Sequence, residues 1–271
     1  MPGRVLHARW ILPFVVLVAA FALWRNVRAP HWRELRPGIE FTTLAGEPYC
    51  RLGSSSVAVL RVDPKHARLR ARYYARQNPP RLLTVLEWQK STGALAVFNA
   101  GQFYPDFRYM GLLVCGGDTV SSKLHAEFQA ALVADSGRAR VLDLARVPLG
   151  ARQRWSDVAQ SFMLFDHAGG VRVRRSDRIA NRTVVGEDER GWIVVCVTEG
   201  AYTLADFAEV LQRAPLKLTH AMSMDGGLEA ELVVRDRDFR YASFGDWPED
   251  REPSAPGAVV PLPAVITVEA R

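Results

Sequence analysis

Lysine is scarce in this chain of 271 residues, even though the chain as a whole is basic. Four lysines stand among 35 basic residues, and the arginines that make up the remainder are dispersed rather than clustered on one predicted helix. A net charge of +6 is compatible with nucleic acid, an anionic membrane or an anionic substrate as a partner. No nucleic-acid-binding motif is recognisable, so the sequence predicts no nucleic-acid partner.

Cysteine and histidine are also sparse, which bears on metal and redox chemistry. The three cysteines, Cys50, Cys115 and Cys196, form no close pair and no metal-ligand spacing. One disulfide and one free thiol are possible, but the sequence does not say which cysteines would pair. Cys196 lies in the apolar run "WIVVCV", which favours a buried residue with a packing role. The six histidines lack a zinc motif such as H-E-x-x-H. We therefore predict no metal and no cofactor.

An uncharged run, "WILPFVVLVAAFALW", occupies residues 10–24, with arginines on both sides. Its 15 residues are fewer than the roughly 17 to 25 of a typical spanning helix and match the upper limit, about 15, of a signal-peptide core. The flanking tryptophans suit the two membrane interfaces. Cleavage signals are weak, because Pro30 directly follows the candidate site at Ala29. We favour an uncleaved membrane anchor over two alternatives, a cleaved signal peptide and a buried helix.

The chain thus divides into four parts. Residues 1–9 are a basic N-terminal region, residues 10–24 the transmembrane or signal-anchor segment, residues 25–38 a polar tether, and residues 39–271 one folded domain. We expect the domain to face the periplasmic or extracellular side of a membrane. The sequence does not define an oligomeric state.

Two short helices are predicted within the folded domain. Thr84 and Glu87 have the spacing of a capping box, and Gly93 follows as a stop. Thr203 is a candidate N-cap for a second helix, in which apolar side chains recur on one face. That face should pack on a sheet.

Strands and tight turns account for most of the remainder. Glycine pairs at 116–117 and 169–170 predict two hairpins, and in the second Arg172 and Arg174 alternate with valines, as on a half-buried strand. "WIVVCV" predicts a strand buried on both faces, and "AVITVEA" near the C-terminus an edge strand. We therefore predict an α+β fold, with a mixed, largely antiparallel sheet and a few packed helices, in a single domain behind the N-terminal membrane anchor.

Three predicted strands end in polar turns that contain glycine. They are "AVFNAG" with Asn99, "VVCVTEG" with Glu199 and "AMSMDGG" with Asp225. Ligands often bind at such strand ends, because the loops are free to vary while the sheet holds them in place. Arg182 in "NRTVVG" also stands beside an apolar strand, and its guanidinium suits a phosphate or carboxylate.

Each of these features also has a purely structural interpretation. Asp225 and Gly226 are a common hairpin pair, and Glu199 is typical of an acid at the start of a helix. Arg182 alone is typical of a solvated or salt-bridged side chain, and Gln160 with Ser161 of ordinary turn chemistry. The functional hypothesis therefore depends on these residues being taken together.

The order of the segments along the chain resembles the phosphodiester glycosidase family. "NAGQFYPDFRYMGLLVCGG" is similar to the family's Asn-Gly/Ala-Gly-x-Phe block, "AQSFMLF" to its Gln-Ser segment and "NRTVVG" to its Arg-Thr-x-x-Gly segment. "TEG", "LADFAEVLQ" and "AMSMDGG" resemble its final strand, helix and strand ending in Asp-Gly-Gly. The resemblance covers roughly residues 39–247, and the ordered set is more specific than any one motif.

The resemblance implies a hydrolase that acts on a sugar whose anomeric oxygen is bonded to phosphate. Carboxylates would stabilise or attack the positive charge that develops on the sugar, and Arg182 would neutralise the departing phosphate. The predicted catalytic residues are Asp225, Glu199, Arg182 and Asn99. The predicted substrate-binding residues are Gly101, Gln102, Phe103, Tyr104, Gln160, Ser161, Thr183, Gly226 and Gly227.

The chain departs from the family pattern at two places. Leu228 and Glu229 follow Asp-Gly-Gly where another Gly and a Ser are usual, and Gln102 stands where an aromatic residue or Met is usual. These departures leave two other hypotheses open. The chain is then either a non-catalytic envelope protein that binds a glycan on the same fold, or a phosphodiesterase that cuts at phosphorus.

Overall fold

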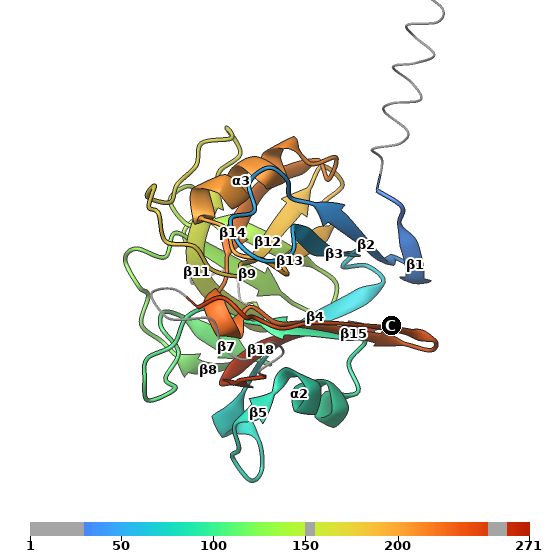
Figure 1. Cartoon of the computed structure of the whole chain (residues 1–271). Helices are drawn as coiled ribbons and strands as arrows, with labels where there is room; N and C mark the ends of the chain where they lie inside the picture. The colour runs from blue at the N-terminus through green and yellow to red at the C-terminus, as the bar shows by residue number, and fades with distance from the viewer. Residues whose placement is uncertain (1–29, 150–154, 249–258) are drawn as a thin grey trace, which may run out of the picture. The chain divides into compact units, whose positions relative to one another are not determined.

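The computed structural model describes residues 30–149, 155–248 and 259–271 (Figure 1). Its contacts divide the chain into residues 1–31 and residues 32–271, and every strand and helix described belongs to the second unit. The predicted membrane segment at residues 10–24 lies outside the described residues. No helix in the described part of the chain is both long and apolar enough to cross a bilayer.

A large antiparallel sheet forms one half of this unit. Its strands lie in the order β1-β2-β3-β13-β12-β14-β11-β7-β8, and β9 adds to it by pairing with both β11 and β10. The bounds are β1 Arg33–Arg36, β2 Ile39–Ala45, β3 Ser56–Val62, β7 Leu113–Cys115, β8 Asp118–Ser121, β9 Ala130–Ala134, β10 Ala139–Asp143, β11 Asp157–Phe165, β12 Thr183–Asp188, β13 Ile193–Thr198 and β14 Leu218–Ser223.

A second sheet of five strands packs on the first in the order β16-β15-β6-β18-β4. Its bounds are β4 Ala67–Tyr73, β6 Ala96–Asn99, β15 Leu232–Asp236, β16 Phe239–Ser243 and β18 Ala264–Ala270. A short pair, β5 (Leu83–Thr84) and β17 (Pro261–Leu262), forms a separate two-stranded sheet. Short 3-10 turns occupy Tyr74–Arg76 and Gly227–Glu229.

The main hydrophobic core lies between the two sheets. Phe98 and Ile266 from the second sheet and Leu60 and Val195 from the large sheet belong to the same buried cluster. A second cluster, with Val194 and Phe207, fills the space between the outer face of the large sheet and α3 (Leu204–Arg213). Figure 1 shows α3 and α2 (Val85–Thr92) on opposite sides of the pair of sheets. The unit is therefore four layers, with helix, sheet, sheet and helix in order.

Both predicted helices are confirmed, together with their caps. The Thr84 side chain accepts a hydrogen bond from the Glu87 amide while the Glu87 carboxylate accepts one from the Thr84 amide, and Gly93 ends α2 with φ of 66°. Thr203 caps α3 by accepting a hydrogen bond from the Asp206 amide. Such reciprocal capping satisfies amide groups that the first turn of a helix leaves without partners.

Two strand predictions had opposite outcomes. The run "WIVVCV" forms β13, which lies inside the large sheet and is buried on both faces as predicted. "AVITVEA" forms β18, but the prediction of an edge strand was wrong, since β18 lies between β6 and β4. Residues 264 to 268 are all buried, as in a strand covered on both faces inside a sheet.

The two predicted hairpins also differ. Gly116 and Gly117 join β7 to β8 with positive φ at both positions, as a two-residue hairpin turn requires. The segment after Gly169 and Gly170 forms no strand beyond an isolated bridge between Phe165 and Val171. Val171 is 42% exposed, and Val173 packs against the cluster between the large sheet and α3 without pairing into the sheet.

The predicted largely antiparallel sheet is confirmed, but the molecule is richer in β-structure than the predicted α+β class. The described residues contain two α-helices, and hairpins connect more of the consecutive strands than helices do. The antiparallel order brings the C-terminal end of β14 beside the N-terminal end of β12. The site lies at this edge.

Candidate active site

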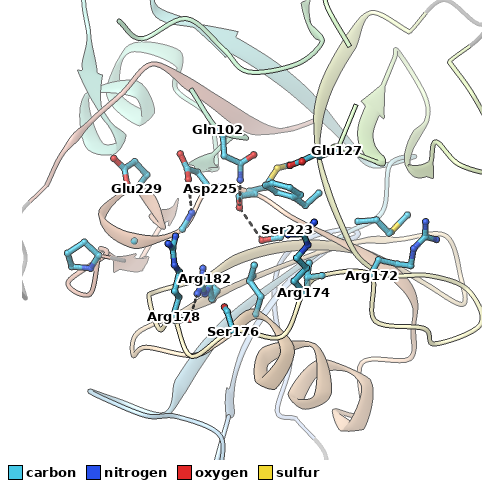
Figure 2. A pocket seen from close by; sticks show the side chains of 18 of the residues that line it. Gln102, Glu127, Arg172, Arg174, Ser176, Arg178, Arg182, Ser223, Asp225 and Glu229 are labelled. Carbon is cyan, nitrogen blue, oxygen red and sulfur yellow. Dashed lines mark hydrogen bonds between the residues drawn. The ribbon is translucent and has the colours of Figure 1, made fainter. Parts of the chain in front are cut away.

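A cavity of about 720 Å³ opens beside the end of β14 and the start of β12. Its walls come from Gln102, from Phe162 and Met163 of β11, from the segment between Arg172 and Arg182, and from the turn at residues 223–229 (Figure 2). These segments are far apart in the sequence and meet here because β11, β14 and β12 are neighbours in the large sheet. Sites of this size hold ligands as large as drugs and cofactors.

Asp225 lies in this cavity on the turn that follows β14. One oxygen of its carboxylate accepts a 3.0 Å hydrogen bond from the Gly226 amide. A Cβ atom at Gly226 would lie 2.9 Å from the Asn181 carbonyl oxygen and 3.2 Å from an Arg182 guanidinium nitrogen. Glycine is therefore what allows the turn to approach Arg182 so closely.

Arg182 reaches the cavity from the residue before β12. It is 4% exposed, and its guanidinium donates 2.9 Å hydrogen bonds to the carbonyl oxygens of Tyr202 and Arg178. Its amide donates to the Thr198 hydroxyl oxygen at 2.8 Å. A buried guanidinium held in this way is already oriented for an anion before the ligand arrives.

Asn99 supports the cavity wall from behind. Its side-chain amide donates to the Asp225 carbonyl oxygen at 2.9 Å, and its oxygen accepts a 2.7 Å hydrogen bond from the Thr183 hydroxyl. The Asp225 amide in turn donates to the Ala100 carbonyl oxygen at 3.2 Å. Asn99 and Thr183 are buried and are not among the described residues that line the cavity. They fix the position of Asp225 through its backbone.

Gln102 fastens the same turn from the side of the cavity. Its side-chain amide donates to the Met224 carbonyl oxygen at 3.2 Å, and its oxygen accepts a 2.9 Å hydrogen bond from the Ser161 hydroxyl. That hydroxyl also lies 2.5 Å from the Ser223 carbonyl oxygen. Gln102 therefore both lines the cavity and ties its floor to β11.

Charged side chains of both signs line the cavity. Arg172, Arg174, Arg178 and Arg182 are the cations, and Glu127, Asp225 and Glu229 the carboxylates. Figure 2 shows Asp225 and Glu229 toward one end, with Arg178 and Arg182 facing them, and Arg172 beyond Arg174 toward the other end. The arrangement offers guanidinium groups to an anion and a carboxylate to a developing positive charge.

A sequence profile for the family described as phosphodiester glycosidase matches residues 92–266. The chain belongs to the phosphodiester glycosidase family. The matched range holds all thirteen residues predicted for the site, from Asn99 to Gly227. A comparison with curated proteins gives no match.

Solved structures share the phosphodiester glycosidase fold at low sequence identity. The zebrafish N-acetylglucosamine-1-phosphodiester alpha-N-acetylglucosaminidase catalytic domain, auto-inhibited by its pro-peptide, is 16% identical, with a TM-score of 0.64 over 90% of this chain and 88% of that one. A Synechocystis protein is 13% identical, with a TM-score of 0.61 over 90% of this chain and 64% of that one. At these identities the likeness shows the fold alone.

Gln160 and Gly101, also predicted for the site, support the cavity without lining it. The Gln160 side chain accepts hydrogen bonds from the amides of Leu112 and His125 and donates to the carbonyl oxygens of His125 and Phe128. A Cβ atom at Gly101 would lie 2.4 Å from the Tyr109 hydroxyl oxygen. Gln160 and Gly101 thus hold neighbouring loops in place through packing and backbone contacts.

Phe103 and Tyr104, predicted to stack on sugar, are not among the described residues that line the cavity. Phe103 forms an isolated β-bridge with Tyr109, and the centre of its ring lies 6.2 Å from the centre of the Phe107 ring. Tyr104 is 38% exposed, with the Arg108 guanidinium 5.3 Å from its ring centre. Both residues belong to an outer loop, and their contact with substrate stays a prediction.

Glu199 is likewise outside the described lining of the cavity. Its carboxylate accepts hydrogen bonds from the Tyr241 hydroxyl at 2.8 Å and from the Ser54 hydroxyl at 2.9 Å. Glu199 lies two residues beyond Val197, which faces the second sheet, and side chains alternate along a strand. The Glu199 carboxylate therefore points toward β16, and its predicted catalytic role stays a prediction.

Five charged residues of the cavity were not predicted from the sequence as site residues: Arg172, Arg174, Arg178, Glu127 and Glu229. The many arginines in "VRVRRSDR" could have indicated an anion-binding segment, but their alternation with valine favoured a half-buried strand. Glu127 carried no signal, and Glu229 stood out only as a departure from the family pattern. The place of Glu229 in the cavity depends on the 3-10 turn at Gly227–Glu229.

Proposed function

We propose that this protein is a hydrolase that cleaves the anomeric bond of a sugar-1-phosphodiester. The observation that carries the proposal is the meeting of the Asp225-Gly226-Gly227 turn with Arg178 and Arg182 in one cavity. Membership of the phosphodiester glycosidase family supports the reaction class.

The reaction requires water, a carboxylate and an anion site. Water adds its oxygen to the anomeric carbon as the bond from that carbon to the phosphate oxygen breaks, and the electron pair leaves with the phosphate. The products are a reducing sugar and a phosphomonoester, and the second proton of water is released or taken up by a base. Asp225 is the candidate to stabilise the positive charge on the sugar ring.

Arg182 and Arg178 are the candidates to bind the departing phosphate. Charge on that group rises as the bond breaks, and fixed guanidinium groups stabilise it without first having to reorient. The contacts of Arg182 to two backbone carbonyl oxygens supply such fixation.

Glu229, one of the residues at which the chain departs from the family pattern, has a role in the proposed reaction. In the proposed reaction it is the carboxylate that lies with Asp225 at one end of the cavity, and it accepts a proton from the attacking water. A non-catalytic glycan-binding protein would not need two carboxylates beside two guanidinium groups, so we favour the enzyme.

Turnover by the purified full-length chain tests the proposal. A panel of sugar-1-phosphodiesters, each with a small alcohol on phosphate, is assayed for reducing sugar. We expect release by the wild type, and a fall of about 10²- to 10⁴-fold for Asp225→Asn. Glu209→Gln, a matched change on the exposed side of α3, should leave the rate unchanged. If neither the wild type nor Asp225→Asn hydrolyses any member of the panel, the proposal that the protein is an enzyme loses its support.

Water labelled with oxygen-18 separates the glycosidase from a phosphodiesterase. Cleavage at the anomeric carbon places the label in the sugar, whereas cleavage at phosphorus places it in the phosphate. Label found in the phosphate would overturn the proposal. Tight glycan binding without turnover would instead favour the non-catalytic alternative.

We propose further that the domain acts outside the cytoplasm, held by residues 10–24. The uncharged run with flanking arginines and tryptophans supports this. Protease added to intact cells or spheroplasts should degrade the domain, with a cytoplasmic protein as the protected control. Protection of the domain until the membrane is lysed would contradict it.

A further inference from the structure

The cavity carries more guanidinium groups than one phosphodiester needs. A phosphodiester has a single negative charge, and Arg178 and Arg182 already stand across from Asp225 to meet it (Figure 2). Arg174 and Arg172 line the cavity further from Asp225 in the same view. The presence of Arg174 points to a second anionic group on the ligand.

Arg174 is the residue that carries this inference. It lines the cavity, and within the described ranges no hydrogen-bond or ion-pair partner is found for its guanidinium. Its neighbour Arg175 is also exposed but does not line the cavity. A guanidinium that faces a binding cavity without a protein carboxylate is available for an anionic ligand.

Arg172, unlike Arg174, has protein partners for its guanidinium, and of the four arginines it lies at the end of the cavity away from Asp225 (Figure 2). Its guanidinium lies 3.3 Å from an Asp166 carboxylate oxygen and 3.8 Å from an Asp143 one, and it also donates to the Gln129 side chain. These contacts fix the segment that presents Arg174 to the cavity. Glu127 lines the cavity as well, so the guanidinium groups here are not the only charged side chains that a ligand meets.

We infer that the substrate is a sugar bonded through its anomeric oxygen to a diphosphate rather than to a single phosphate. This rests on the proposed function. The first phosphate binds Arg178 and Arg182, and the second binds Arg174. A cavity of about 720 Å³ has room for a sugar and two phosphates. The bond that breaks is still the one from the anomeric carbon to oxygen, and the leaving group is a diphosphate ester.

Binding of inorganic pyrophosphate and inorganic phosphate to the full-length chain tests the inference without any turnover. By calorimetry at fixed ionic strength, we expect pyrophosphate to bind at least about tenfold more tightly than phosphate. Arg174→Gln should remove most of this preference and leave phosphate binding within about threefold. The matched control Arg175→Gln should keep it. Equal affinity for the two anions, equal effects of the two substitutions, or no pyrophosphate binding would overturn the inference.

A second experiment measures the hydrolysis of two esters of the same sugar. One carries a methyl phosphodiester and the other the corresponding methyl diphosphate. We expect kcat/KM to favour the diphosphate, and Arg174→Gln to bring the two values together. If neither ester is hydrolysed but Arg174 still governs pyrophosphate binding, the proposed hydrolase fails and the diphosphate site stands. If both are hydrolysed equally, with no effect of Arg174, the hydrolase stands and the diphosphate inference fails.

Discussion

The side chain of Asn99 donates a 2.9 Å hydrogen bond to the main-chain carbonyl oxygen of Asp225, which lies 126 positions later in the chain. Asn99 ends β6 in the second sheet, whereas Asp225 follows β14 in the large sheet. One amide therefore joins the two sheets at the point where the cavity opens. The bond explains why an apolar strand ends in asparagine: Asn99 positions the carboxylate of Asp225 by holding its backbone.

Asn99→Ala should destabilise the fold and impair the site together. The substitution leaves the buried Thr183 hydroxyl without its acceptor and the Asp225 carbonyl oxygen without a donor. We expect a loss of about 1–3 kcal/mol in the free energy of unfolding, measured by urea titration. Lys90→Ala on the exposed surface of α2 should change it by less than about 0.5 kcal/mol. Equal stability of the two variants would show that the network contributes nothing.

Gly101→Ala tests whether this glycine serves packing rather than a ligand. The new methyl would lie 2.4 Å from the Tyr109 hydroxyl oxygen and 2.9 Å from the Gln160 carbonyl oxygen. Overpacking of this kind typically costs about 1–3 kcal/mol, so the melting temperature should fall by several degrees. Gly137→Ala is the control, because nothing lies within 4 Å of its added methyl. A Gly101→Ala protein as stable as this control would contradict the packing role.

The variants Glu229→Gln and Glu199→Gln should show which of these two carboxylates takes part in catalysis. Glu229 lines the cavity, so we expect turnover to fall by about 10²-fold or more. Glu199 is held by Tyr241 and Ser54 outside that lining, so we expect Glu199→Gln to keep turnover within about tenfold. Steady-state kcat on the same sugar-1-phosphodiester is the measurement. The reverse ranking would assign the catalytic role to Glu199 and withdraw it from Glu229.

Glu231 should make stability depend on pH. Burial raises the pKa of this fully buried carboxyl from 4.5 to about 8. The folded chain keeps a proton that the unfolded chain releases between these values, so the free energy of unfolding falls as the pH rises through the window, by up to about 1.4 kcal/mol per pH unit. Below about pH 4.5 both states hold the proton, and above about pH 8 neither does, so the slope from this group vanishes.

Glu231→Gln mimics the protonated acid and should flatten this profile. We expect the variant to match the wild type near pH 4.5 and to exceed its stability at pH 8 in urea titrations. Glu34→Gln, at an exposed residue of β1, should leave the profile unchanged. A wild-type slope that persists in Glu231→Gln would exclude Glu231 as its source.

Local features of the sequence determined much of the architecture. The capping box at Thr84, the N-cap at Thr203 and the glycine pair at 116–117 act within a few residues, so their outcome follows from the chain itself. The order of the motifs also identified the family. Of the residues predicted for the site, those that line the cavity are Gln102, Arg182, Asp225, Gly226 and Gly227.

Only the tertiary structure decided which charged side chains meet. Glu199 and Arg182 both stand at the ends of strands in the large sheet, but the register pairs Thr183 with Val197, so side-chain alternation sends Glu199 to the opposite face from Arg182. Arg174 and Glu229 reach the cavity because irregular segments bend there, and no periodic pattern records such a bend. Local sequence fixes each strand and cap, whereas long-range pairing fixes which ends share a cavity.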